Sequence, residues 1–182
     1  MTLCITTYTM TNGDKLLISI NNKAFAVDAT AVVAVVEVER IFMLPVIQSS
    51  SSFQKPGFIK GTITRRGEVV VVIDIGELFE MPSIQGKGPY RVAIIKKDAL
   101  SLGILVPGTG HHPTGHLSQI GSVGNDNDGI SFIWKEELDK LEFEPSNENY
   151  ILGLIDPSGK KIRLIDWKKV FEKTHKLLSC RQ

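Results

Sequence analysis

The sequence predicts a mostly β fold made of two similar β-units that pack against each other. Three observations support this fold class. Ile and Val together number 35 against 23 for Leu and Ala, short apolar segments alternate with Gly- and Asn-containing turns, and one pattern of 22 residues occurs twice. β-Branched side chains suit the half-buried surface of a sheet. A pattern that recurs at this length indicates a repeated structural unit.

The size and charge of the chain exclude several classes of protein. Its 182 residues suit one domain, or one domain built from two sub-domains. The net charge is +1, without the clustered positive excess that is typical of nucleic-acid-binding proteins. No apolar run approaches the roughly 18 residues that a bilayer span requires. The N-terminus lacks the features of a secretory signal, so we expect a cytoplasmic protein.

The first elements are predicted from turn chemistry and spacing. Residues 16–20 and 24–27 are joined by an Asn-rich turn and are typical of a β-hairpin. Residues 29–38 are predicted to form a short helix, because Asp28 can cap it and the valines within it have helical spacing. In chain order, the further predictions are a strand at 41–47, an exposed loop at 48–56, a hairpin of 61–65 and 69–73, a helical turn at 75–81, strands at 91–97, 102–106 and 130–134, and a long loop at 107–129.

The most informative feature is the repeat of residues 58–79 at residues 150–171, in which seven of 22 aligned positions are identical without a gap. In each copy a strand enters, a Gly-containing turn reverses it, and a second strand ends at an Asp that can cap a helix. The second copy continues into an amphipathic helix over residues 167–178. We therefore predict structural roles for the paired residues Gly61 and Gly153, Gly67 and Gly159, and Asp74 and Asp166. Loss of either Asp cap is expected to cost about 1 kcal/mol of stability.

Motifs for catalysis or metal binding are weak. His111, His112 and His116 lie in the predicted loop 107–129 without a Cys or carboxylate at a matching spacing, which favours exposed loop histidines over a zinc site. Asp74 has a twin in the repeat, so capping explains it better than acid–base catalysis. We expect no enzyme activity, no cofactor and no metal. An alternative is a small-ligand or metal-binding protein that uses the 107–129 loop.

Two adjacent arginines, Arg65 and Arg66, lie at the tip of the predicted hairpin of the first copy. Neighbouring side chains on a strand point to opposite faces, so at least one of them faces solvent or a partner. The second copy has Pro157 and Ser158 at these positions, and the turn therefore does not need the arginines. A solvated turn and a recognition site both remain open, and the repeat favours recognition at Arg66.

Residues 58–74 read FIKGTITRRGEVVVVID and resemble the hallmark of the CheW-like domain, approximately F-I-K-G-x-I-N-x-R-G-x-V-x-P-V-x-D. Residues 25–28 resemble the second strand of this family, and residues 150–171 resemble its final repeat. The sequence departs from the pattern at Thr64 and Val71, and residues 106–110 replace a V-D-x-V stretch.

The resemblance implies two intertwined five-stranded SH3-like β-barrels with a C-terminal helix. It places an N-terminal tail at 1–14, the CheW-like domain at 15–178 and a C-terminal tail at 179–182. It implies a non-enzymatic adaptor in chemotaxis signal transduction, whose partners are the regulatory domain of a CheA-type histidine kinase and the cytoplasmic tip of a methyl-accepting chemoreceptor. From the charge balance and the short apolar runs we expect neither nucleic-acid binding nor membrane insertion. The candidate partner-binding residues are Glu37, Arg65, Arg66, Gly67, Val70 and Val72. An alternative within this fold is a divergent module of another signalling or pilus-motility complex.

Overall fold

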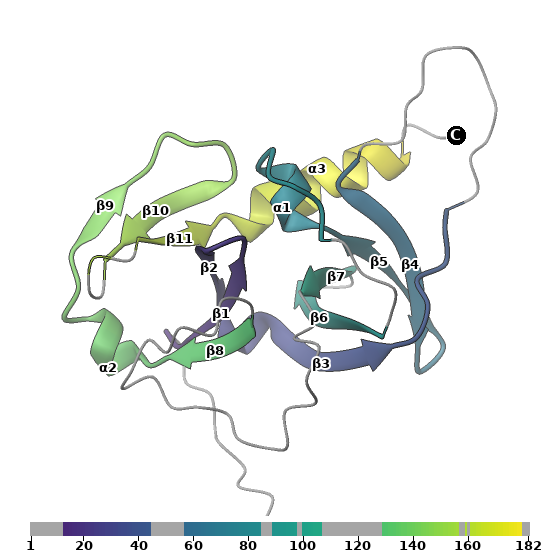
Figure 1. Ribbon diagram of the computed structural model, residues 1–182, viewed down its shortest axis with the longest axis horizontal. Helices are drawn as coiled ribbons and strands as arrows, with labels where there is room; N and C mark the ends of the chain where they lie inside the picture. The colour runs from purple at the N-terminus through teal and green to yellow at the C-terminus, as the bar shows by residue number, and fades with distance from the viewer. Residues whose placement is uncertain are drawn as a thin grey trace, which may run out of the picture.

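The structure is a computed structural model that describes residues 13–44, 57–84, 89–97, 100–106, 129–156, 159 and 161–179. Its strands form two sheets, at the left and right of Figure 1, and a long helix extends over the second sheet. In chain order the elements are β1 (Lys15–Ile20), β2 (Lys23–Asp28), the 3-10 helix η1 (Ala29–Ala31), β3 (Val32–Val38), β4 (Ile59–Arg65), β5 (Glu68–Ile73), α1 (Ile75–Leu78), β6 (Tyr90–Lys97), β7 (Leu100–Val106), β8 (Gly129–Ile133), α2 (Lys135–Leu138), β9 (Phe143–Pro145), β10 (Ile151–Ile155), β11 (Ile162–Ile165) and α3 (Trp167–Ser179).

The two sheets have equivalent strand orders, β8-β1-β2-β11-β10-β9 in the first and β3-β6-β7-β5-β4 in the second. In each sheet a hairpin pairs in parallel with the second strand of another hairpin, β2 with β11 and β7 with β5. In the second sheet Phe42 pairs with the edge strand β4, as β9 pairs with β10 in the first sheet. Its N–H donates to the carbonyl of Thr62 on β4 at 2.8 Å, and its carbonyl accepts the N–H of Thr62 at 2.7 Å. The mostly β prediction of two barrels with a C-terminal helix is confirmed, with six strands in the first sheet instead of five.

The chain enters the first barrel, builds the second, and returns to the first. Strands β1 and β2 belong to the first sheet, β3 to β7 form the second, and β8 to β11 complete the first. The first barrel therefore needs segments from both ends of the described chain, which is the physical meaning of intertwined barrels.

The two copies of the repeat follow the same backbone path. Each hairpin has an irregularity at the same place, between Ile59 and Gly61 in one and between Ile151 and Gly153 in the other. Gly67 and Gly159 both have a φ of 81°. The predicted equivalence of the copies is therefore confirmed in the backbone.

Two predictions for the first half are wrong. Only Ala29–Ala31 is helical, and Val32–Val38 forms strand β3, antiparallel to β6. Stiff β-branched side chains and the ladder with β6 outweigh a chance helical spacing of valines. The strand predicted over 41–47 is absent from its described part, residues 41–44, which forms only the bridge at Phe42. The predicted loop at 48–56 and residues 107–128 of the predicted loop at 107–129 lie outside the described residues.

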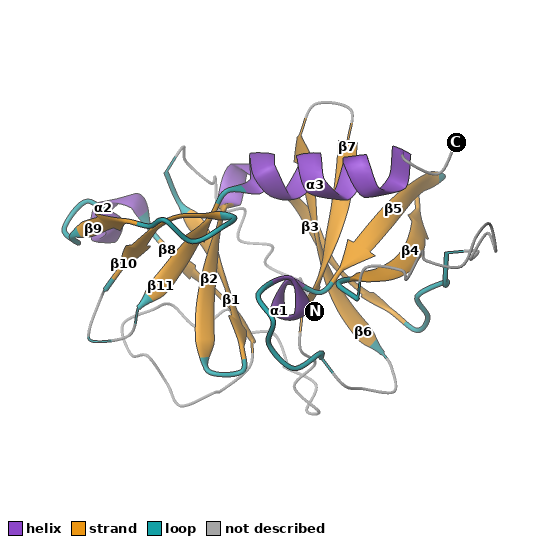
Figure 2. Cartoon of the chain, turned by 90° about the horizontal axis from the view of Figure 1, so that it is seen from above, coloured by secondary structure: helices purple, strands orange, loops and turns teal. Residues whose placement is uncertain are grey.

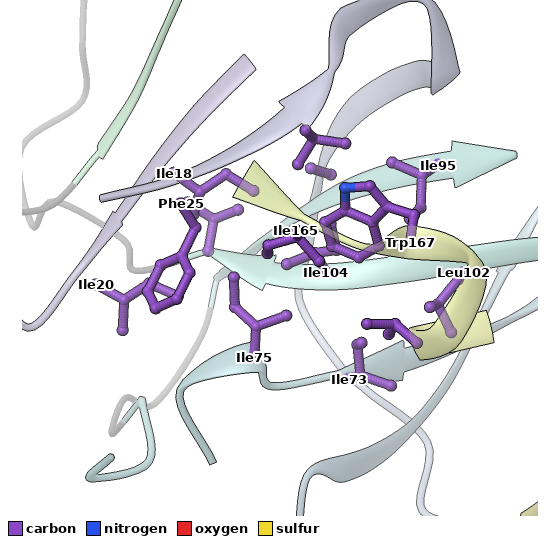
Figure 3. Close-up of a cluster of buried hydrophobic side chains, with 14 of the residues drawn as sticks. Ile18, Ile20, Phe25, Ile73, Ile75, Ile95, Leu102, Ile104, Ile165 and Trp167 are labelled. Atoms are coloured by element: carbon purple, nitrogen blue, oxygen red, sulfur yellow. The ribbon is translucent and has the colours of Figure 1, made fainter. Parts of the chain in front are cut away.

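The largest hydrophobic core lies between the two barrels and joins them to α3. Figure 3 shows Phe25 of the first barrel and Ile73 of the second in one cluster with Trp167 of α3. Figure 2 shows α3 running from the end of β11 across the second barrel. Lys173 on α3 lies over the rings of Phe58 and Tyr150, which are the first residues of the two repeat copies, with its Nζ 6.0 and 5.4 Å from the ring centroids. Smaller cores fill each barrel; that of the second contains Ile63, Val70, Val72, Val92, Ile94 and Leu105.

Candidate partner-binding surface

The turn between β4 and β5 holds an arginine in a left-handed backbone conformation. Arg66 has a φ of 49° and Gly67 a φ of 81°. A two-residue hairpin turn with two positive φ values normally takes Asn or Gly at both positions. A β-carbon at Gly67 would meet no atom within 4 Å, so this glycine is required for its φ and not for space. A non-glycine residue held in this region costs roughly 1 to 3 kcal/mol, which makes Arg66 a functional candidate.

The open end of the second barrel collects polar side chains above its apolar interior. Side chains alternate along a strand, so residues two positions apart share a face. Toward the open end of the barrel, the inward-facing Ile63, Val70 and Ile94 are therefore followed on the same face by Arg65, Glu68 and Lys96. The ladders pair Arg65 with Glu68 and Lys96 with Ser101. They line a cavity of about 190 Å³. We call this cavity the barrel mouth; its full lining is Val33, Arg65, Arg66, Glu68, Val70, Ile94, Lys96 and Ser101.

The barrel mouth carries an excess of positive charge. Three of its side chains are cationic and one, Glu68, is anionic. Lys96 Nζ lies 3.9 Å from a carboxylate oxygen of Glu68, and both side chains are substantially exposed. Within the described part of the chain, neither Arg65 nor Arg66 forms an ion pair with a carboxylate.

Strand β3 presents a second surface at the edge of the same sheet, and this surface shares Val33 with the barrel mouth. Val33 and Val35 are 50% and 42% exposed, and Glu37 continues the same alternating face. The ladder sets Val32 opposite Ile95 and Glu37 opposite Arg91. Glu37 is therefore at the far end of β3 from the barrel mouth, so the fold does not place it with Arg65, Arg66 and Gly67.

Val70 and Val72, which are predicted as partner-binding residues, do not lie on the outer face of the second barrel. Val70 is 2% exposed and Val72 is fully buried, because both point into the second barrel. Val70 forms part of the floor of the barrel mouth, and Val72 lies one layer deeper. The exposed valine of this strand is Val69, at 66%. A shift of one residue along a strand exchanges its two faces, and the sequence alone does not fix which face is inside.

The two Asp residues of the repeat both accept backbone hydrogen bonds at the start of a helix. Oδ1 of Asp74 accepts the N–H groups of Gly76 and Glu77 at 2.9 and 3.4 Å. Oδ1 of Asp166 accepts the N–H of Lys169 at 3.2 Å. These are the hydrogen bonds of an N-cap. Neither carboxylate lines the barrel mouth.

The paired glycines before the turns are required for space. A β-carbon on Gly61 would lie 2.2 Å from the carbonyl oxygen of Phe42, and one on Gly153 would lie 2.3 Å from the ring of Phe143. Each glycine therefore lets the next backbone segment close the barrel.

Several residues of this surface and its support were missed from the sequence. Lys96 and Ser101 could have been found, because Lys96 follows the buried Ile94 by two positions on one strand. Asp14 gave no such signal. It was assigned to the N-terminal tail, but it is buried and its Oδ1 accepts the N–H of Lys135 at 3.0 Å, at the start of α2. A contact across so many residues leaves no local pattern.

The prediction that the histidines of the 107–129 loop form no metal site falls on residues that the structure does not describe. His111, His112 and His116 lie outside the described residues. Across the ranges that the structure describes, no three His, Cys, Asp or Glu side chains are grouped as metal ligands. Within the same ranges, no helix has the length and apolar character to cross a membrane.

Comparison with known proteins places this geometry in a family. The model of the CheW-like domain family matches residues 14–141. The crystal structure of the scaffolding protein TtCheW from Thermoanaerobacter tengcongensis is similar in fold, with a TM-score of 0.59 over 86% of this chain and 90% of that chain, at 20% sequence identity. A search of curated protein sequences gives no significant match.

Proposed function

The chain belongs to the CheW-like domain family, and from this premise we propose that it is a non-enzymatic scaffold in chemotaxis signalling. The proposed partners are the regulatory domain of a CheA-type histidine kinase and the cytoplasmic tip of a chemoreceptor, with all three in the cytoplasm. The observation that carries the proposal is the family match over residues 14–141. The similar crystal structure, of a protein described as a scaffold, supports the same role.

The exposed face of β3 is the surface that we propose for the kinase regulatory domain. Val33 and Val35 keep about half of their surface in solvent, although both are β-branched apolar residues on a strand. Contiguous apolar side chains on an exposed sheet edge are suited to contact with another protein, since the partner removes them from water. Glu37, at the end of the same face, supplies a charge that can set the orientation of the partner.

Binding of the full chain to a purified kinase regulatory domain tests this proposal. We expect the wild-type chain to bind, and Val35→Lys to weaken binding by at least about tenfold, because it places a charge in an apolar contact. Leu152→Lys is the matched control, since Leu152 is 53% exposed on β10 of the first barrel. It should bind like the wild type.

A receptor cytoplasmic fragment forms the second arm of the experiment. Binding to neither fragment would overturn the chemotaxis proposal. If Val35→Lys and Leu152→Lys weaken binding of the kinase regulatory domain equally, the scaffold proposal stands, but the face of β3 is not the kinase-binding surface.

A further inference from the structure

We propose that the barrel mouth binds one carboxylate side chain, Asp or Glu, from an acidic segment of a partner protein. The inference deepens the proposed scaffold function and rests on it, because it names the chemical group that a partner would insert.

The size and lining of the barrel mouth fit a single side chain. Its volume of about 190 Å³ is below the roughly 300 to 1,000 Å³ of cavities that hold cofactors and drug-sized ligands. Its floor is formed by Val70 and Ile94, each 2% exposed, and Val33 adds a half-exposed apolar wall. An acidic side chain has a short aliphatic stem and a charged end, so its stem can lie on this floor.

The rim of the barrel mouth supplies the donors that a carboxylate needs. Arg65 and Arg66 have planar guanidinium groups, which match the two oxygens of a carboxylate. Ser101 adds a hydroxyl that can donate. Within the described residues the two arginines have no carboxylate partner, so an incoming group would not have to displace one.

The backbone of the turn gives an independent reason to assign a role to Arg66. Its φ of 49° is unfavourable for arginine, and Asn or Gly would fit the turn better. The equivalent turn of the first barrel has the same φ at Gly159 but no arginine in its sequence. The basic mouth is therefore a property of one barrel and not of the shared backbone path.

Glu68 favours a singly charged ligand over a phosphate. Its carboxylate lies on the rim, 3.9 Å from Lys96, and would repel any second anion. The repulsion grows with the charge of the ligand, so a phosphate group of nearly two charges is disfavoured more strongly than a carboxylate. For the same reason, we expect removal of the charge of Glu68 to strengthen carboxylate binding.

Nuclear magnetic resonance titration of the ¹⁵N-labelled full chain tests the proposal with N-acetylglutamate N-methylamide as the probe. We expect saturable shifts of the amide signals of Arg65 to Glu68, Lys96 and Ser101. The double variant Arg65→Gln with Arg66→Gln should weaken binding of the probe by at least about tenfold. Lys176→Gln should not change the binding of the probe, because Lys176 is exposed on α3 and does not line the cavity. Glu68→Gln should bind more tightly than the wild type.

Three results would overturn the proposal: equal shifts with the uncharged N-acetylglutamine N-methylamide, no shifts at the barrel mouth at saturating probe, or tighter binding of inorganic phosphate than of the carboxylate. The proposed function is tested separately by the kinase and receptor fragments. If these fragments bind the wild type and the double arginine variant equally, the scaffold stands and the carboxylate site does not. If they fail to bind while the probe binds, the site stands as an anion site and the scaffold proposal fails.

Discussion

Asp74 and Asp166 hold matching positions in the repeat, but their carboxylates have different surroundings. Asp74 is fully buried, and besides its two cap hydrogen bonds its Oδ2 accepts the hydroxyl of Ser83 at 3.1 Å and the N–H of Ile84 at 2.9 Å. Lys60 Nζ is 3.8 Å from the same oxygen. The side chain of Asp166 is 14% exposed, and Lys169 is its ion-pair partner at 3.2 Å. The sequence predicted both caps, but not that Asp74 also anchors the segment at Ser83 and Ile84 that follows α1.

We expect Asp74→Ala to cost at least about 3 kcal/mol of unfolding free energy, because it leaves one buried donor and several half-buried donors without an acceptor. Asp166→Ala should cost about 1 kcal/mol, the usual value for a lost cap. Urea unfolding of the two variants measures the difference. Equal costs would show that the contacts of Asp74 beyond its cap add nothing to stability.

Arg66→Asn should relieve the backbone of the turn without loss of stability. Asn tolerates a positive φ, so the free energy of unfolding should stay the same or rise by up to about 1 kcal/mol. The same variant should weaken binding of the carboxylate probe. A fall in the free energy of unfolding would mean that the Arg66 side chain makes contacts that stabilise the fold itself. Lys97→Asn, at an exposed strand end, is the control for the loss of one positive charge.

At the scale of elements, local signals predicted the hairpins and the last helix. Apolar segments on either side of a Gly turn predicted β4 and β5, and a wide apolar stripe predicted α3. Local signals failed for β3, whose valines satisfy a helical spacing but pair with β6. They also failed for α2, a single turn whose first N–H is bound by Asp14. Both failures have the same cause: the deciding contact is made by residues far away in the sequence.

The closing of the second barrel gives a prediction for Gly61. Gly61→Ala should destabilise the protein by about 1 to 3 kcal/mol or more, because its β-carbon would collide with the backbone of Phe42. Gly129→Ala is the matched control, since a β-carbon there would meet no atom within 4 Å. Thermal unfolding compares the two. Equal melting temperatures would show that the segment around Phe42 can move away at no cost.

At the scale of the whole molecule, α3 links the two barrels. Its buried face, which includes Trp167, Val170 and Phe171, belongs to the core cluster shared by both sheets. Lys173 contacts the first residue of each repeat copy. The sequence predicted the helix and two packed units, but it could not predict that one helix would join them, since the repeat describes each unit separately.

Phe171→Ala should therefore lower the stability of both barrels together, by about 3 to 5 kcal/mol. We expect one unfolding transition, in which tryptophan fluorescence and far-ultraviolet circular dichroism coincide as denaturant increases. Wild-type protein provides the reference curve. Two separate transitions in the variant would show that the barrels are stable independently of the helix.

The return of the chain to its first barrel has a consequence for protein synthesis. On the ribosome, the β1–β2 hairpin emerges early, but β2 pairs with β11, about 140 residues later. At roughly 5 to 20 residues per second, the edge of β2 waits roughly 7 to 30 s for its partner. Strands β3 to β7 are contiguous, so the second barrel can close during this interval. The nascent chain thus carries a finished barrel beside an unpaired apolar hairpin, which makes that hairpin the segment on which a chaperone would act.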